Sequence, residues 1–389
     1  MIDIYLISEE GKLLRNLPQL FHAEDFNVIC IGGRSSFLID EHDFIKIEKI
    51  GGETFIGAFL RHDSLLRSIN GIVILGTDSE MREVSTSTIP LEIKLKLLPG
   101  KSLDSLKLYD SKIGLFEIFQ KAGANFPESR VIQTRDDLRS LLNTWNPPFL
   151  LKRDSGWGGD GIIKISPENM EAMESSDQLE LPALAQEKLE GAEISVEAFF
   201  LNGRLRAYLY RRATGLIYPY GPSFASTYET PPTIDFLSVL QKIGLHGEIT
   251  GFVNSSFIRN PVTGAHTLIE FDPRPNVWHF LAPRFGLNVS SFFSATSDVE
   301  IQSYEGPKID FIMMERYAQY LATHFNLLQT IRELQRFRKN QVMVASFNGS
   351  VDTNSLVIIT KIFWLVILRI IYRKIPKALQ AGIKKTMSL

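Results

Sequence analysis

Cysteine is almost absent from this chain, which has one, Cys30, among 389 residues. A single thiol cannot form an intramolecular disulfide, so a fold held together by disulfides is excluded. Cys30 lies in the apolar segment 27–31, where a buried strand position is favoured over a nucleophile. An excess of positive charge is also lacking, because the formal net charge is −2. The composition therefore does not favour nucleic acid as a partner.

Catalytic histidine patterns and an export signal are also lacking. The seven histidines show no metal-ligand spacing, and no Ser/His/Asp or Cys/His arrangement is evident. Segment 1–7 has no basic region and carries Asp3 among apolar residues, so we interpret it as a first strand and not as a signal peptide. With 44% hydrophobic and 22% charged residues the chain is typical of globular proteins. We therefore expect the bulk of the protein to be cytoplasmic.

Long hydrophobic runs are confined to the C-terminal tail. Residues 356–372 are apolar except for Thr360, Lys361 and Arg369, and more lysines and arginines follow. This run is short for a membrane span, and charges near its centre are costly. One interpretation of 356–385 is an in-plane helix on the cytoplasmic membrane face, held by its basic flank. A buried terminal helix or a dimer contact has equal weight, and the oligomeric state stays open.

Strand-like and helix-like segments alternate along the first part of the chain. Segments 2–8, 27–33 and 71–78 are apolar and partly β-branched, and the segments between them have apolar residues at helical spacing. This alternation predicts a parallel sheet in an α/β domain over 1–108. Loop 76–79 follows the third strand, where binding loops of such sheets lie. A substrate contact and a solvated turn both remain open for this loop.

A glycine-rich turn between two apolar strands is the most informative segment. It contains the glycines Gly156, Gly158, Gly159 and Gly161. Glycines let the backbone approach an anion and point N–H groups at it, and Lys152 on the preceding strand adds positive charge. The turn is neither a Walker loop nor a Rossmann turn, because a strand follows it. Alone it is a weak signal, since many hairpins have such a turn.

Two further segments carry charged residues in suggestive places. Segment 186–193, Gln-Glu-Lys-Leu-Glu-Gly-Ala-Glu, can present backbone groups to an adenine edge and a glutamate to ribose hydroxyls, or it is the charged edge of a hairpin. On the strand predicted at 266–271, alternation places Glu270 and Asp272 on one face. Paired carboxylates suit Mg²⁺ beside phosphates, and Arg274 can stabilise charge on a phosphoryl or acyl-phosphate oxygen. The alternative is a solvated strand face with a salt bridge to Arg274.

The order of these elements carries more information than each alone. Lys112 at a helix start is followed by Lys152 with its glycine turn, the glutamate-rich segment and the paired carboxylates that end in Pro-Arg. In this order they resemble the ATP-grasp superfamily, in the branch of carbamoyl-phosphate-synthetase-like carboxylate–amine ligases. The resemblance covers about residues 1–300.

The resemblance implies a fold of mixed α/β and α+β class. A parallel-sheet pre-ATP-grasp domain at 1–108 precedes a two-lobed ATP-grasp domain at 109–300, whose lobes meet near residue 190. A period of apolar residues over 308–338 predicts a helical extension, which we place at 301–345. The apolar and then basic tail occupies 346–389.

The resemblance also implies residue roles. Lys112 and Lys152 contact the phosphates of ATP, and the loop 156–161 closes over them. The base and ribose contacts are, in order, Glu187, Leu189 and Glu193. Glu270 bridges Mg²⁺ ions, Asp272 ligates one of them, and Arg274 holds the acyl phosphate or the substrate carboxylate.

The chain departs from the family pattern at the metal site. Asp272 stands where asparagine is most frequent, which adds negative charge. An upstream Asp, Glu or Gln ligand is expected near 254–256, where Asn254 and Ser256 offer only neutral ligands for a second Mg²⁺. Downstream of the glutamate-rich segment 186–193, Arg212 and Ser223 lie where such enzymes line the acceptor site. They are weak substrate-binding candidates, with a solvated strand end as the alternative.

These features predict an ATP-dependent ligase acting on small molecules. ATP would convert a carboxylate to an acyl phosphate, and an amine would attack it to give an amide, ADP and phosphate. One alternative is a phosphotransferase acting on a hydroxyl. The other is a non-catalytic nucleotide-binding protein tethered at the membrane through 356–385.

Overall fold

The computed structural model describes most of the chain. The described residues are 1–21, 25–41, 43–109, 111–156, 159–170, 173, 180–276, 279–293, 300–324, 342–345 and 351–352. They divide into two compact units, one within Met1–Tyr210 and Pro231–Tyr304, the other within Arg211–Thr230 and the described residues from Glu305 onward. Each unit is described by itself below.

The chain begins with a four-stranded parallel sheet of order β3-β2-β1-β4, which confirms the predicted parallel sheet. Its strands are β1 (Ile2–Ser8), β2 (Phe26–Gly32), β3 (Phe44–Lys46) and β4 (Ile72–Leu75). Its helices are η1 (Pro18–Phe21), α1 (Phe55–Leu60), α2 (Asp63–Ser68), α3 (Asp78–Thr86) and α4 (Leu91–Leu97). Cys30 in β2 is fully buried, and burial raises the pKa of its thiol to about 12, as expected for a structural strand residue.

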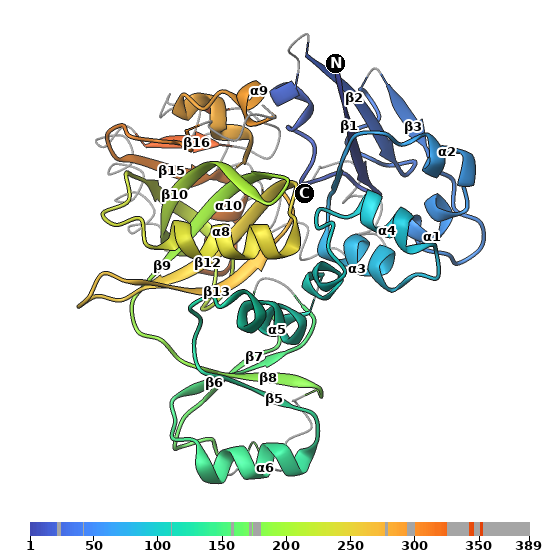
Figure 1. Cartoon of the computed structure of the whole chain (residues 1–389). Coiled ribbons are helices and arrows are strands. Elements are labelled where there is room, and N and C mark those ends of the chain that lie inside the picture. The colour runs from blue at the N-terminus through green and yellow to red at the C-terminus, as the bar shows by residue number, and fades with distance from the viewer. Residues whose placement is uncertain are drawn as a thin grey trace. The chain divides into compact units, whose positions relative to one another are not determined.

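A second, antiparallel sheet has the order β5-β8-β6-β7. Its strands are β5 (Ser129–Ile132), β6 (Phe149–Arg153), β7 (Ile162–Ile165) and β8 (Ala183–Glu187). Helix α6 (Arg135–Thr144) begins with a capping box between Thr134 and Asp137 and lies across this sheet (Figure 1). Its leucines at helical spacing, Leu138 and Leu141, pack against Phe149. In this small lobe, one face of the sheet packs against α6, and Lys152 belongs to the strand β6.

The larger sheet of the first unit has the order β13-β12-β9-β10. Its strands are β9 (Ala192–Leu201), β10 (Arg204–Leu216), β12 (Gly251–Arg259), β13 (His266–Asp272) and β14 (Gln302–Ser303), which pairs with β10. Its helices are η2 (Asp104–Leu108), α5 (Lys112–Ala122), α8 (Phe236–Gly247), η3 (His279–Phe285) and α9 (Val289–Phe292). The strand predicted at 266–271 is confirmed by β13.

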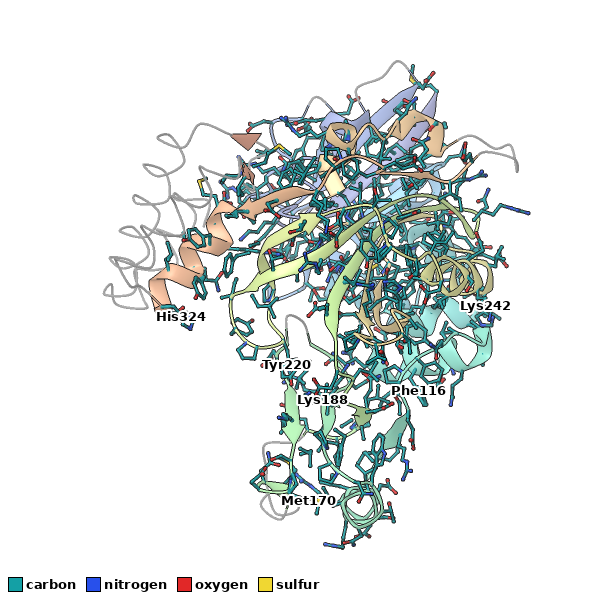
Figure 2. The ribbon with its side chains drawn as sticks, turned by 90° about the vertical axis from the view of Figure 1, so that its left-hand side faces the viewer. Phe116, Met170, Lys188, Tyr220, Lys242 and His324 are labelled. Carbon is teal, nitrogen blue, oxygen red and sulfur yellow. The ribbon has the colours of Figure 1, made fainter. Side chains whose placement is uncertain are left out.

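Helices α5 and α8 pack on each other, and Figure 2 labels Phe116 on α5 and Lys242 on α8. Lys242 Nζ donates to the carbonyl oxygen of Gly123 at 3.0 Å. Gly123 ends α5 with a φ of 61°, a left-handed conformation that glycine adopts without strain. The ammonium thus meets the negative end of the α5 dipole.

The second unit contains the end of β10 from Arg211 onward, β11 (Ser223–Tyr228), β15 (Ile309–Met313), β16 (Met343–Ala345), β17 (Val351–Asp352) and α10 (Met314–His324). The helical extension predicted at 301–345 contains the helix α10, but strands β15 and β16 flank it. Phe311 and Met314 satisfy helical spacing, but Phe311 belongs to the strand β15. Short apolar segments fit both periods, and pairing with β11 decides between them.

Among the described residues, no helix has the length and apolar character needed to cross a membrane. The tail segment 356–385, for which we predicted membrane contact, lies outside them. The domain boundaries at 108 and 300 remain predictions.

Candidate active site

Lys152 is a buried cation on the small lobe. It lies on β6 opposite Leu184 of β8, and 7% of the residue is exposed. Its Nζ donates to Gln186 Oε1 at 2.6 Å. Burial, partly opposed by the charge of Glu270, lowers the pKa of Lys152 to about 8. A buried ammonium held by a neutral amide keeps its charge available for an anion.

Lys112 is the first residue of α5, and Asp154 and Gly156 at the start of the glycine turn hold this helix end in place. Ser111 caps the helix, and its hydroxyl donates to Asp154 Oδ1 at 2.9 Å. The same oxygen accepts from the backbone N–H of Ile113 at 2.9 Å. Lys112 Nζ donates to the carbonyl oxygen of Gly156 at 3.0 Å. Hydrogen bonds between residues more than forty positions apart therefore connect the start of the glycine turn to the N-terminus of α5.

The glycine turn needs backbone conformations that only glycine adopts easily. Gly156, Gly159 and Gly161 have φ values of 133°, 82° and 74°. A Cβ on Gly161 would lie 2.9 Å from Cβ of Arg153, so the close approach also requires glycine. Gly158 lies outside the described residues.

The segment expected to meet the base and ribose connects the two lobes. Glu187 ends β8 and is exposed, whereas Leu189 and Glu193 are half-buried. The charge of Glu193 acts on the pKa of Lys152, raising it, so the two side chains lie in one electrostatic neighbourhood. Lys188, labelled in Figure 2, forms an ion pair with Glu190. That pair fits the alternative of a charged edge for this part of the segment.

The paired carboxylates lie on β13, opposite β12. The pairing places Ser256 opposite Glu270 and Asn254 opposite Asp272, with a bulge that leaves Ile269 out of the ladder. The bulge explains why both Leu268 and Phe271 reach the core although they are three residues apart. Beyond the bulge the pairing is regular, so Glu270 and Asp272 lie on one face of the strand.

The electrostatics of Asp272 reflect this crowding. Burial, reinforced by Glu270, raises the pKa of Asp272 well above its ordinary value. Asn254 Nδ2 lies 3.4 Å from Asp272 Oδ2, and Asn276 Nδ2 donates to Asn254 Oδ1 at 3.0 Å. Within the described residues, no cluster of three or more Asp, Glu, His and Cys side chains is arranged to hold a metal ion by itself. Two carboxylates are what this face offers.

Arg274 is held by carboxylates from two sides. Its Nε lies 2.7 Å from both oxygens of Asp78, and its Nη2 donates to Asp272 Oδ2 at 3.2 Å. Burial alone would lower the pKa of Arg274, but Asp78 and Asp272 raise it above its ordinary value. The side chains of Arg274 and Asp272 are 15% and 19% exposed, so this is not a solvated salt bridge.

Asp78 and Gln186 are the site residues that sequence reasoning did not single out. Asp78 belongs to loop 76–79, for which a solvated turn was one interpretation, and its contact with Arg274 rules that out. The signal for Gln186 was a glutamine in the otherwise apolar start of the strand Ala183–Glu187. Both contacts join residues far apart in the chain, so neither follows from local spacing.

The acceptor-site candidates lie in the second unit. Ser223 accepts a hydrogen bond from Arg211 Nη1 at 3.0 Å, and Ser226 accepts from the same nitrogen at 3.0 Å. Arg212 instead lies 3.5 Å from Glu229 with 41% of its side chain exposed. The structure therefore does not bring Arg212 and Ser223 together, and their role remains a prediction.

Comparison with solved structures identifies the fold. Phosphoribosylamine–glycine ligase from Thermotoga maritima is 16% identical, with a TM-score of 0.55 over 79% of each chain. Biotin carboxylase from Campylobacter jejuni is 15% identical, with a TM-score of 0.56 over 76% of this chain and 72% of its own. Both are ATP-grasp proteins. The chain has an ATP-grasp fold.

Other ATP-grasp structures agree. L-amino acid ligase from Bacillus licheniformis is 13% identical, with a TM-score of 0.51 over 72% of this chain and 68% of its own. No protein-family model and no curated protein sequence matches the chain. The ATP-grasp fold expected from the order of motifs is confirmed by structure, at identities where sequence comparison alone does not detect it.

Proposed function

We propose that this protein is an ATP-dependent ligase that joins a carboxylate to an amine. The observation that carries the proposal is a pair of oppositely charged clusters in one compact unit. Lys112 and Lys152 are held by neutral oxygen atoms, whereas Glu270 and Asp272 crowd on one strand. A nucleotide with a divalent cation supplies the charge that each cluster lacks.

On the nucleotide side, this chain's residues would bind and orient ATP. The two lysines would contact the phosphates, and the glycine turn would supply backbone N–H groups. Glu187 and Leu189 would meet the adenine and Glu193 the ribose, as the ATP-grasp fold implies. The structure of biotin carboxylase named above is a complex with an ATP analogue, which supports the choice of nucleotide.

The acidic face fits Mg²⁺. Magnesium is bound in such sites by one or two carboxylates together with substrate phosphates. Glu270 and Asp272 supply two, and burial together with the charge of Glu270 raises the pKa of Asp272, so a bound divalent cation would favour both ionised carboxylates. When bound, the ion would neutralise charge on the phosphates. Asn254 and Ser256 add only neutral ligands, so we propose one strongly held ion.

The proposed chemistry needs no covalent enzyme intermediate. A carboxylate oxygen of the acid attacks the γ-phosphorus, the bond to ADP breaks, and an acyl phosphate forms. The amine nitrogen then attacks the acyl carbon, phosphate leaves, and the nitrogen gives up a proton. Lys152 and Arg274 would stabilise the negative charge that develops on phosphoryl and acyl oxygen atoms.

The test is release of ADP and phosphate from Mg-ATP by the purified chain, against pools of amino acids and small carboxylic acids. We expect release that requires both an acid and an amine and that falls by about 100-fold or more in Glu270→Gln. Asp136→Asn, on the exposed surface of α6, is the matched control for loss of one carboxylate.

The same assay separates the alternatives. A phosphotransferase would release ADP without phosphate and yield a phosphorylated hydroxyl compound. A nucleotide-binding protein without catalysis would bind ATP and show equal turnover in wild type and Glu270→Gln. The names of two resembling enzymes, phosphoribosylamine–glycine ligase and L-amino acid ligase, favour amide formation. Sedimentation with anionic vesicles would test the predicted membrane contact of 356–385.

A further inference from the structure

Gln186 is a buried amide with no place in the proposed chemistry. It lies on β8, and 6% of it is exposed. It lies two residues along β8 from Leu184, the residue directly opposite Lys152 in the β6–β8 pair. Burying an amide costs free energy unless both of its ends are hydrogen-bonded, so both ends need partners.

The orientation of the amide follows from a directed chain of hydrogen bonds. Ser129 Oγ donates to the carbonyl oxygen of Pro127 at 2.9 Å, and a carbonyl can only accept. The Ser129 hydroxyl therefore accepts from Gln186 Nε2, 3.1 Å away. This leaves Gln186 Oε1 for Lys152, whose Nζ donates to it at 2.6 Å. Each donor in the chain points away from the lysine.

We propose that Gln186 is a positioning residue that holds the Lys152 ammonium in place for the nucleotide phosphates without neutralising it. A carboxylate at this position would form a buried ion pair and cancel the charge that an anion needs. An apolar side chain would leave the buried ammonium without this acceptor. A glutamine avoids both. This inference rests on the proposed function, because it assumes that Lys152 meets phosphate.

Other charges around Lys152 do not replace this role. Lys112 on α5 repels the ammonium, whereas Glu270 on β13 and Glu193 on β9 attract it. In the proposed complex, Mg²⁺ would compensate Glu270 and the ribose would occupy Glu193. Gln186 is the neighbour whose hold on the ammonium does not change when the ligand binds.

The test is a double-mutant cycle on ATP affinity, measured by calorimetry with the full chain. We expect Gln186→Glu to weaken ATP binding by about tenfold or more, because it pairs the ammonium that should bind phosphate. In a Lys152→Met background the same change should have little effect, since Gln186 acts through Lys152. Gln133→Glu, an exposed position of the same lobe, controls for one added negative charge.

Equal weakening by Gln186→Glu with and without Lys152 would overturn the inference, and so would unchanged affinity. A wild type that does not bind ATP would instead refute the proposed function. In that case titration of Lys152, followed by NMR of the ¹³C-methylated amine without ligand, still decides about Gln186. Gln186→Glu should raise the pKa of Lys152 above the wild-type value of about 8, and an unmoved pKa would overturn the inference.

Discussion

The two charged sides of the site are built in opposite ways. On the small lobe, Lys152 and Lys112 are held by neutral acceptors, the Gln186 amide and the Gly156 carbonyl. On β13, the carboxylate of Asp272 lies beside Glu270 and is held by the charged guanidinium of Arg274. The lysines thus keep their charge, whereas the carboxylates share one cation that Asp78 also binds.

This difference shows what each side can recognise. Ammonium groups held by neutral atoms remain free to attract an anion, and their burial makes that attraction stronger than in water. Crowded carboxylates attract a compact cation, and Arg274 can compensate them only in part. The pKa values move in the corresponding directions, down for Lys152 and up for Asp272. The ligand that we propose, a nucleotide with its metal ion, would supply the opposite charge on both sides.

Removing the charge on the lysine side should have the largest effect. We expect Lys152→Met to weaken ATP binding by about 100-fold, because a charge-assisted contact to phosphate is lost from a buried site. Calorimetric titration with ATP measures this. Lys164→Met, an exposed lysine on β7, is the control. Equal affinity for ATP in wild type and Lys152→Met would contradict the proposal that Lys152 binds phosphate.

The same substitution should stabilise the unliganded protein. The pKa of Lys152 is about 8 in the fold and 10.5 ordinarily, so the unfolded chain binds this proton more tightly. The penalty is fully present below pH 8 and disappears as the pH rises to 10.5. Lys152→Met should therefore raise the free energy of unfolding at pH 7 by up to about 3 kcal/mol. Urea unfolding of wild type and Lys152→Met across this pH range measures the gain. A gain that does not change with pH would contradict the lowered pKa of Lys152.

On the acidic side, Asp272→Asn tests whether the crowded carboxylates destabilise the unliganded protein. The pKa of Asp272 is raised in the fold, so its ionised form destabilises the protein as the pH rises above the ordinary value of 3.8. We expect a gain of about 1 kcal/mol in unfolding free energy at pH 7, together with weaker Mg²⁺ binding. Thermal unfolding with and without Mg-ADP measures both. A loss of stability would mean that the ion pair with Arg274 outweighs repulsion by Glu270.

The smallest effect is expected in the second unit. The side chain of Arg212 is 41% exposed and pairs at 3.5 Å with Glu229, which Lys308 also pairs with, so Arg212→Gln should change the unfolding free energy by less than about 0.5 kcal/mol. Any larger change in the KM of an acid or amine, once the substrates are known, would then report substrate contact. Unchanged KM would remove Arg212 from the acceptor site.

Much of the fold could be predicted because its signals are local. Alternating strands and helices predicted the parallel sheet, and the glycines predicted the turn between β6 and β7, where Gly156, Gly159 and Gly161 have positive φ values. Within the helical extension predicted at 301–345, the strand β15 was not predicted, because its apolar residues fit both periods until pairing with β11 is known. The apolar pattern of this segment is clear, but the strand β11 that pairs with it cannot be identified from the sequence.

Residue types and short backbone periods are enough to predict which groups the site contains. Lys152 before the glycine turn, and Glu270 and Asp272 on one strand, follow from residue type and from backbone periods that span a few residues. The partners that hold those groups come from distant parts of the chain. Arg274 and Asp78 are 196 residues apart, and Lys152 and Gln186 are 34 apart. Their contacts depend on how strands pair and pack, which no local spacing records.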